Sequence, residues 1–264
     1  MGTVDLNEII SDILVDFYMT FDLTPVDVKY SIVDDMEKAY AAIRPDYATA
    51  HPETVATANM YNGLTVMPET LDGAFDVLLN AKRMLTYLRE ENFTWVGTIV
   101  HETTHAIDYS EYANLVWIDS YEELQDIGRH AMFQLWTEFN ARSKGYYFVR
   151  KYSFKDMRDM SQVKDIINHE LPAQYERLCR EYHATSDGYQ QAYLVAQYLG
   201  RLYTLQQLFP TTFTNDFVKS HLGANQWMYE WYLLLSKYNQ LADAYEHFDE
   251  MRYILLSRTD DTTE

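Results

Sequence analysis

The segment Thr94–Asp108, TWVGTIVHETTHAID, constrains this chain most because it contains the pattern His-Glu-x-x-His. Successive residues of an α-helix are separated by about 100° and 1.5 Å, so His101 and His105 would lie about 40° apart and roughly 6 Å along one face. Two imidazoles placed in this way can bind one metal ion, and Glu102 beside them can hold a water molecule on that ion. Zinc suits such a site because it lowers the pKa of its bound water by several units.

The residues around this pattern support a helix. The chain has 8 His and 18 Glu among 264 residues, so about 0.02 matches to the pattern are expected by chance. Gly97, one turn before His101, leaves the ligand face bare, although Gly costs a helix about 1 kcal/mol relative to Ala. Helical spacing predicts that one set of residues faces a core: Val96, Ile99, Val100, Thr103 and Ile107. The alternative is two structural histidines with a chance glutamate.

Glu138 is the best candidate for the third ligand that a catalytic zinc site requires. A second long helix is expected over residues 122–149, and Glu138 falls on its apolar stripe of Leu124, Ile127, Ala131 and Leu135. A carboxylate on a core-facing stripe is costly unless it is paired or bound to a metal.

Other assignments stay open at this point. The alternative for Glu138 is a buried ion pair, with Arg142 or Arg150 as the partner. Weaker ligand candidates lie off the stripe or at the helix start: Glu122, Glu123, Asp126 and His130. Asp108, one turn past His105, could orient the histidines from the metal helix. A donor for a developing oxyanion cannot be chosen among Tyr121, His130, Tyr146, His183 and His221.

His-Glu-x-x-His followed on a later helix by Glu138-x-x-Ala141 resembles the gluzincin metallopeptidases, a branch of the zincin superfamily. The resemblance implies that His101, His105 and Glu138 bind zinc and that Glu102 is the general base. It covers roughly residues 20–150 by topology and only about ten residues by motif. Many members of this family carry Asp four residues after the ligand Glu, whereas this chain has Arg142 there. The C-terminal residues resemble no family.

Hydrophobic periodicity predicts an α+β order for the N-terminal half. The expected elements are a helix at 5–21, a strand at 26–32, a helix at 34–44, hairpin strands at 54–61 and 64–67 around Asn62-Gly63, a helix at 70–91 and the metal helix. We expect 64–67 to be the edge strand, to which an extended peptide could add. From about residue 161 the chain is expected to be all helical, with helices near 189–208, 224–236 and 240–257.

Charge and cysteine usage exclude several classes of partner. The formal net charge of −19 argues against binding nucleic acid or an anionic membrane. The chain has one cysteine, an acidic N-terminus unlike a signal peptide, and no apolar run of 18 residues. These features indicate a cytoplasmic protein.

Together these patterns predict an α+β protein with a zincin-like N-terminal lobe at 1–150, built from a small mixed sheet and an active-site helix, and an all-helical lobe at 151–264. The predicted function is zinc-dependent hydrolysis of peptide or protein substrates. The alternative is a catalytically silent interaction protein on a zincin scaffold, of phage or mobile-element origin. The sequence does not indicate an oligomeric state.

Overall fold

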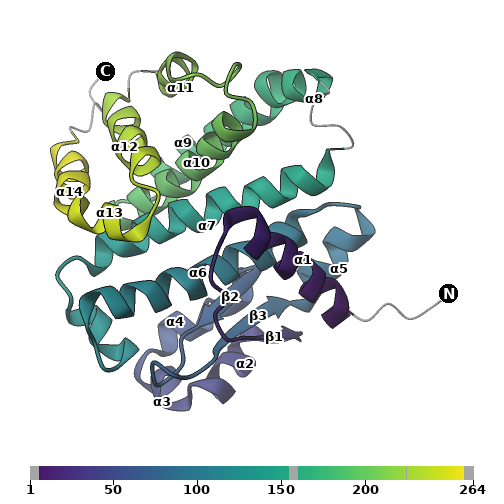
Figure 1. Ribbon diagram of the computed structural model, residues 1–264, viewed down its shortest axis with the longest axis vertical. Helices are drawn as coiled ribbons and strands as arrows, with labels where there is room; N and C mark the ends of the chain where they lie inside the picture. The colour runs from purple at the N-terminus through teal and green to yellow at the C-terminus, as the bar shows by residue number, and fades with distance from the viewer. Residues whose placement is uncertain (1–5, 155–159, 224, 259–264) are drawn as a thin grey trace. The chain divides into compact units, whose positions relative to one another are not determined.

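The computed structural model describes residues 6–154, 160–223 and 225–258, which are mostly helical and include a three-stranded mixed sheet (Figure 1). This is the predicted α+β class. The chain forms two compact units. The first contains the described residues up to Leu124 together with Phe148–Ser153. The second contains Gln125–Tyr147 and the described part of the chain from Phe154 onward. The functional division predicted at residue 150 stays a prediction.

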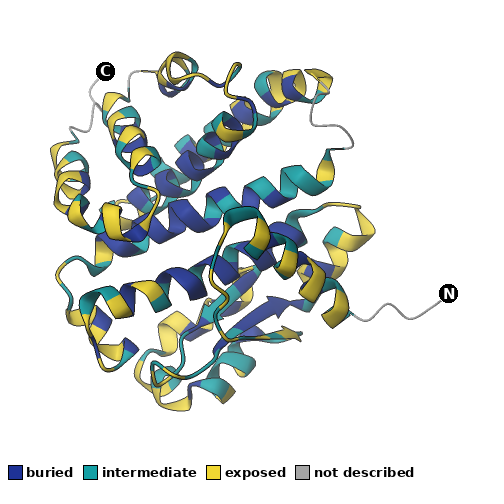
Figure 2. Cartoon of the chain, in the orientation of Figure 1, coloured by how far each residue is buried: buried dark blue, intermediate teal, exposed yellow. Residues whose placement is uncertain are grey.

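The sheet of the first unit has the order β1-β3-β2. Strand β1 (Val28–Val33) runs parallel to β3 (Phe75–Asn80), and β2 (Gly63–Val66) runs antiparallel to it. Five of the six residues of β3 are buried, which explains its nearly continuous apolar run (Figure 2). Within the described residues β2 is an edge strand, so the expected edge at 64–67 is confirmed.

The hairpin predicted around Asn62-Gly63 is wrong, because β2 pairs with β3 instead. Residues before the turn form the helix α4 (Pro52–Ala56) and the 3₁₀ turn η1 (Ala58–Met60). Pro52 stands at the first helical position, where its fixed φ favours a helix over a strand. The side chain of Asn59 also accepts a hydrogen bond from the backbone N of Met36 at 2.8 Å, a long-range contact that local patterns do not encode.

The helix predicted at 70–91 is wrong in its first half. Residues 75–80 form β3, and only α5 (Ala81–Arg89) is helical. The change occurs at Asn80, whose side-chain oxygen caps α5 by accepting a hydrogen bond from the backbone N of Arg83 at 3.3 Å. A strand that is buried on both faces shows no alternation of apolar and polar residues. Its hydrophobic pattern therefore cannot be distinguished from that of a buried helix.

The helices of the first unit surround this sheet. They are α1 (Leu6–Phe21), α2 (Met36–Ile43), α3 (Pro45–Ala50), α4, α5 and α6 (Thr94–Val116), followed by the 3₁₀ segment η2 (Tyr121–Asp126). Helix α6 packs against β2 and β3. A hydrogen bond of 2.7 Å between Tyr30 Oη and Thr103 Oγ1 also joins α6 to β1. The predicted helix at 122–149 is corrected at its start, because η2 and an exposed Gly128 precede α7 (His130–Ser153).

The described part of the second unit is entirely helical. It contains residues 130–147 of α7, then α8 (Met160–Asp165), the π-helical turn η3 (Ile166–Glu170), α9 (Leu171–Ala184), α10 (Gly188–Leu208), α11 (Asn215–Leu222), α12 (Gln226–Lys237), α13 (Leu241–Glu246) and α14 (Phe248–Ser257). Its core combines aliphatic and aromatic side chains, and Phe139, Trp231 and Phe248 are almost fully buried. No helix among the described residues is long and apolar enough to cross a lipid bilayer.

Candidate metal centre

Helix α6 presents His101 and His105 to the same point. Their Nε2 atoms lie 3.1 Å apart, and the two rings are perpendicular. In a tetrahedral site with zinc–nitrogen bonds of 2.0–2.1 Å, two ligand nitrogens lie roughly 3.3–3.4 Å apart. The two imidazoles are therefore within a few tenths of an ångström of the spacing that one zinc ion requires.

The opposite side of α6 holds these histidines in place. All five residues predicted to face a core are buried, which confirms that prediction: Val96, Ile99, Val100, Thr103 and Ile107. Thr103 and Thr104 are also buried, and their hydroxyls donate to the carbonyls of Ile99 and Val100 at 2.6 and 2.8 Å. Because these hydroxyls bond within the helix, the face can pack against the sheet without leaving them unsatisfied.

Glu102 lies against the edge strand β2. The Oγ1 atom of Thr65 is 2.8 Å from the backbone oxygen of Glu102 and 2.9 Å from its Oε2 atom, so the hydroxyl can donate to either. Gly63 approaches so closely that a Cβ atom there would lie 2.8 Å from Glu102 Cγ. Glu102 is only 7% exposed. Strand β2 thus fixes the position of the predicted general base.

Glu138 lies in α7 and is 2% exposed. Its Oε1 atom is 3.4 Å from Nη2 of Arg142, so the ion pair considered as an alternative is present. Tyr193 of α10 also makes a side-chain hydrogen bond to Glu138. Burial, followed by the nearby Glu138 carboxylate, raises the pKa of Tyr193 well above its usual value, so its hydroxyl stays protonated and donates.

The apolar stripe that pointed to Glu138 is only partly present. Leu135 is buried, but Ala131 is exposed and Leu124 lies in η2 instead of α7. Helix α7 is instead buried on every side from Leu135 to Ala141. The burial of Glu138 is therefore as predicted, although it does not depend on one stripe.

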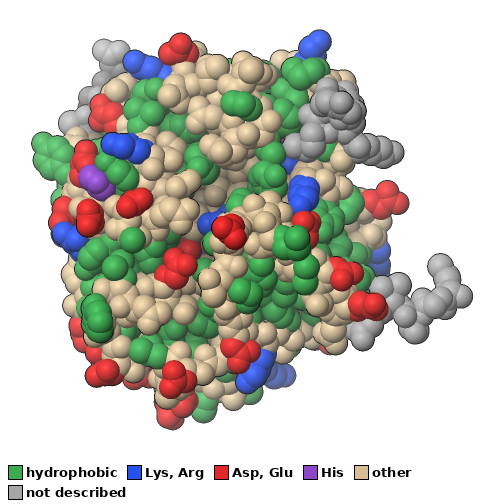
Figure 3. Space-filling view, viewed as in Figure 1, with side chains coloured by type: hydrophobic (Ala, Val, Ile, Leu, Met, Phe, Trp, Pro, Cys, Tyr) green, Lys and Arg blue, Asp and Glu red, His purple; other side chains and the backbone are tan. Residues whose placement is uncertain are grey.

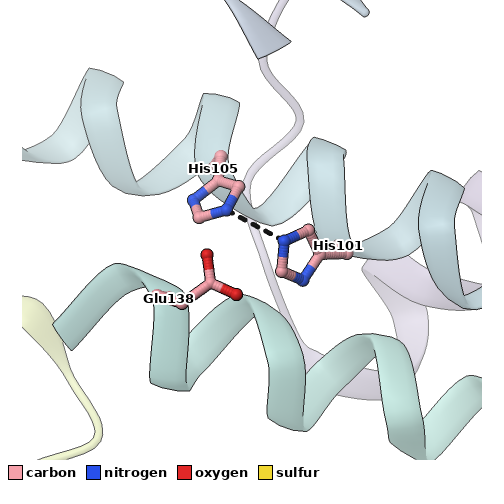
Figure 4. Close-up of side chains that lie close together, drawn as sticks. All are labelled: His101, His105 and Glu138. Atoms are coloured by element: carbon pink, nitrogen blue, oxygen red, sulfur yellow. Dashed lines mark hydrogen bonds between the residues drawn. The ribbon is translucent and has the colours of Figure 1, made fainter. Parts of the chain in front are cut away.

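The structure brings His101, His105 and Glu138 together. One ligand atom from each residue lies within 4.8 Å of the others, and Figure 4 shows the two imidazoles and the carboxylate close together. Nitrogen from imidazole and oxygen from carboxylate are typical zinc donors, but they also suit other first-row divalent ions. The group could hold a metal ion, and zinc stays a prediction.

Asp108 is buried in α6, and its predicted role in orienting the histidines stays a prediction. Tyr146 donates to Oε1 of Glu170 at 2.7 Å, Tyr121 packs edge-on against Phe75, and His221 stacks on Phe217. These contacts fit structural roles and assign no oxyanion donor.

Sequence reasoning missed Thr65 and Tyr193, which contact Glu102 and Glu138. Thr65 is 37 residues from Glu102, and Tyr193 is 55 residues from Glu138. Neither position carries a local pattern that distinguishes it from other threonines or tyrosines in the chain, which has 23 Tyr.

Comparison with family models, with curated proteins and with solved structures finds no match to this chain. The argument for a function therefore depends on the residues of the site and their geometry.

Proposed function

We propose that this protein is a zinc-dependent metallopeptidase in which His101, His105 and Glu138 hold the metal and Glu102 is the general base. The observation that carries the proposal is the 3.1 Å separation of the two Nε2 atoms on α6, with the Glu138 carboxylate in the same group. Two histidines and one glutamate form the ligand set of several catalytic zinc sites, which keep a further position open.

The first unit supports a zincin-like lobe. A small mixed sheet with an antiparallel edge strand packs against the helix that carries the His-Glu-x-x-His pattern. Strand β2 is an edge within the described residues, and an extended peptide could pair with an edge strand through main-chain hydrogen bonds. The substrate class proposed here is accordingly a peptide or an unfolded protein segment.

When bound, zinc would supply Lewis acidity, which polarises a scissile carbonyl and makes water more acidic. The protein's own residues then move the protons. Glu102 accepts a proton from the attacking water as the water oxygen bonds to the carbonyl carbon. Glu102 afterwards returns that proton to the leaving amine nitrogen as the carbon–nitrogen bond breaks, so the reaction consumes one water and regenerates the carboxylate.

Thr65 and Tyr193 position these groups. The Thr65 hydroxyl lies 2.9 Å from Oε2 of Glu102, which limits the rotation of the carboxylate. Tyr193 donates to Glu138 and orients it for metal binding, in the way that hydrogen-bonding partners of metal ligands generally do. Many gluzincins have an aspartate four residues after the ligand glutamate, and this chain has Arg142 there. We propose that Thr65 and Tyr193 orient Glu102 and Glu138 in this chain.

One observation favours a second candidate, a catalytically silent scaffold that binds other proteins. The Arg142–Glu138 ion pair gives the buried carboxylate a partner that needs no metal. In that case the two histidines would be structural, and the chain would neither retain zinc nor cleave peptides.

A digestion experiment separates the two candidates. Zinc-loaded full-length protein is incubated with a peptide library, with and without a chelator, and the products are identified by mass spectrometry. We expect cleavage that requires zinc, and we expect Glu102→Gln to keep its zinc while losing about 10²–10⁴-fold in rate.

Glu111→Gln is the matched control, because Glu111 is an exposed carboxylate on the same helix. It should cleave at the wild-type rate. Absence of cleavage by zinc-loaded wild type, or full activity of Glu102→Gln, would overturn the proposed function.

A further inference from the structure

The guanidinium of Arg201 in α10 is half-buried and has an unusual environment. Among the described residues no group makes an ion pair or a hydrogen bond with it. Burial, followed by the charge of Arg142, lowers the pKa of Arg201 to about 10. Arg201 is partly exposed, and its guanidinium has no nitrogen that is both buried and without a partner. Water can therefore reach this guanidinium, but no carboxylate pairs with it, so an anion could bind there.

Close packing of α10 on α7 brings the two arginines together. A Cβ atom at Gly200 would lie 2.6 Å from the backbone oxygen of Phe139 and 3.1 Å from Cβ of Arg142, so only glycine fits at this crossing. The Thr204 hydroxyl fixes the crossing by donating to the backbone oxygen of Ser143 at 2.7 Å. Arg201 follows Gly200 directly, so the packing that requires glycine also places a second positive charge near Arg142.

The nearby carboxylates do not form an ion pair with Arg201. Glu138 is 3.4 Å from Arg142 and in the proposed function is a metal ligand. Glu170, at the end of η3, contributes charge near Arg201, but its Oε1 atom already accepts from Tyr146 and from Gln174, each at 2.7 Å.

Arg177 also contributes positive charge near Arg201, but it pairs with Glu181. With a divalent metal bound at Glu138, the region would carry three arginines and the metal against Glu138, Glu170 and Glu181. The local charge would then be positive, although the chain has a net charge of −19. The acidic side chains seen in Figure 3 are scattered over the molecular face instead of gathered in one place.

We propose that Arg142 and Arg201 bind a carboxylate group of the peptide substrate. This inference rests on the proposed peptidase function and adds a substrate class, namely peptides that present a carboxylate near the scissile bond. Guanidinium groups bind carboxylates through two parallel hydrogen bonds, a geometry that lysine cannot reproduce. Arg142 is 29% exposed and Arg201 is half-buried, so a ligand can reach both.

Two carboxylates occur on peptides, the C-terminal group and the side chains of Asp and Glu. The experiment therefore uses two matched pairs of fluorescein-labelled hexapeptides. One pair differs in a free or an amidated C-terminus, and the other is amidated and differs in an internal Glu or Gln. Binding to full-length Glu102→Gln, which is not expected to cleave, is measured by fluorescence polarisation in the zinc-loaded and the chelator-treated states.

We expect at least one acidic peptide to bind about tenfold or more tightly than its neutral partner, and the pair that shows this identifies the source of the carboxylate. Adding Arg201→Gln should bring the acid-to-neutral ratio close to one in both metal states. Adding Arg252→Gln is the control, because Arg252 is an exposed arginine on α14, and the ratio should not change. An acid-to-neutral ratio near one in the parent protein, or an unchanged ratio after Arg201→Gln, would overturn the proposal.

Stability measurements show whether a variant loses peptide binding because it has unfolded or because it lacks the guanidinium. If Arg201 serves a ligand, Arg201→Gln should be at least as stable to heat as the parent, because it removes a positive charge that has no ion pair and is repelled by Arg142. Arg201→Lys should fold and keep the charge but lose most of the preference, because it lacks the planar fork. A large drop in melting temperature for both variants would instead assign Arg201 a structural role. The binding measurement involves no hydrolysis, so it stands or fails separately from the peptidase assay.

Discussion

A single added methyl group on β2 should displace the Glu102 side chain. A Cβ atom at Gly63 would lie 2.8 Å from Cγ of Glu102, 2.8 Å from Cγ2 of Thr98 and 3.1 Å from Oε1 of Glu102. Carbon atoms in optimal contact are about 3.5–4.0 Å apart, so at Gly63→Ala these side chains must retreat by roughly 1 Å. Thr98 is fixed on a buried helix face, and Glu102 therefore has to take up most of the movement.

The expected cost has two parts. Overpacking of this kind lowers the free energy of unfolding by about 1–3 kcal/mol. A displacement of about 1 Å at a catalytic group lowers the rate by about 10²-fold. Zinc binding should persist, because the atoms that a Cβ at Gly63 would meet belong to Glu102 and Thr98 and to neither histidine.

The assay measures kcat/KM, zinc content and urea unfolding for Gly63→Ala and for two controls. Gly73→Ala meets a comparable clash, 2.6 Å from Cβ of Pro68, so it should lose stability while keeping its activity. Gly128→Ala meets nothing within 4 Å and should resemble wild type in all three measurements. Wild-type kcat/KM in Gly63→Ala would refute the argument that β2 fixes the general base.

Two further predictions concern the second unit. Tyr193→Phe removes the hydrogen bond to Glu138, so a zinc titration should show about tenfold weaker binding, and an unchanged dissociation constant would exclude a positioning role. Burial lowers the pKa of His130 to about 4 from 6.5, so the unfolded chain takes up this proton before the folded protein does. Stability should therefore fall as the pH drops from about 6.5 to 4, and urea unfolding of His130→Gln should show a smaller fall. An identical pH dependence in wild type and His130→Gln would show that other groups cause it.

The sequence predicts the metal helix well because its information is local. The positions of His101 and His105 and the five buried residues of the opposite face all follow from helical geometry, which depends on spacing along one helix. The burial of Glu138 also agrees with the prediction, although the stripe behind it includes the exposed Ala131.

The errors occur where tertiary contacts override local signals. Residues 75–80 form the central strand because β1 and β2 pair with its two edges, and the pairing with β1 joins Val28 to Phe75, 47 residues along the chain. The Asn62-Gly63 turn signal fails because the residues before it are helical. Thr65 and Tyr193 could not be identified because only the folded chain places them beside Glu102 and Glu138.

The zinc content of the purified full-length chain tests the central claim most directly. Wild type and His105→Ala are dialysed together against the same low concentration of free zinc and analysed by mass spectrometry for bound metal, with Glu111→Gln as the control. We expect one zinc per chain in wild type and in Glu111→Gln, and essentially none in His105→Ala, because the site would lose one of its three protein ligands. Equal zinc in wild type and His105→Ala would contradict the assignment of the metal centre.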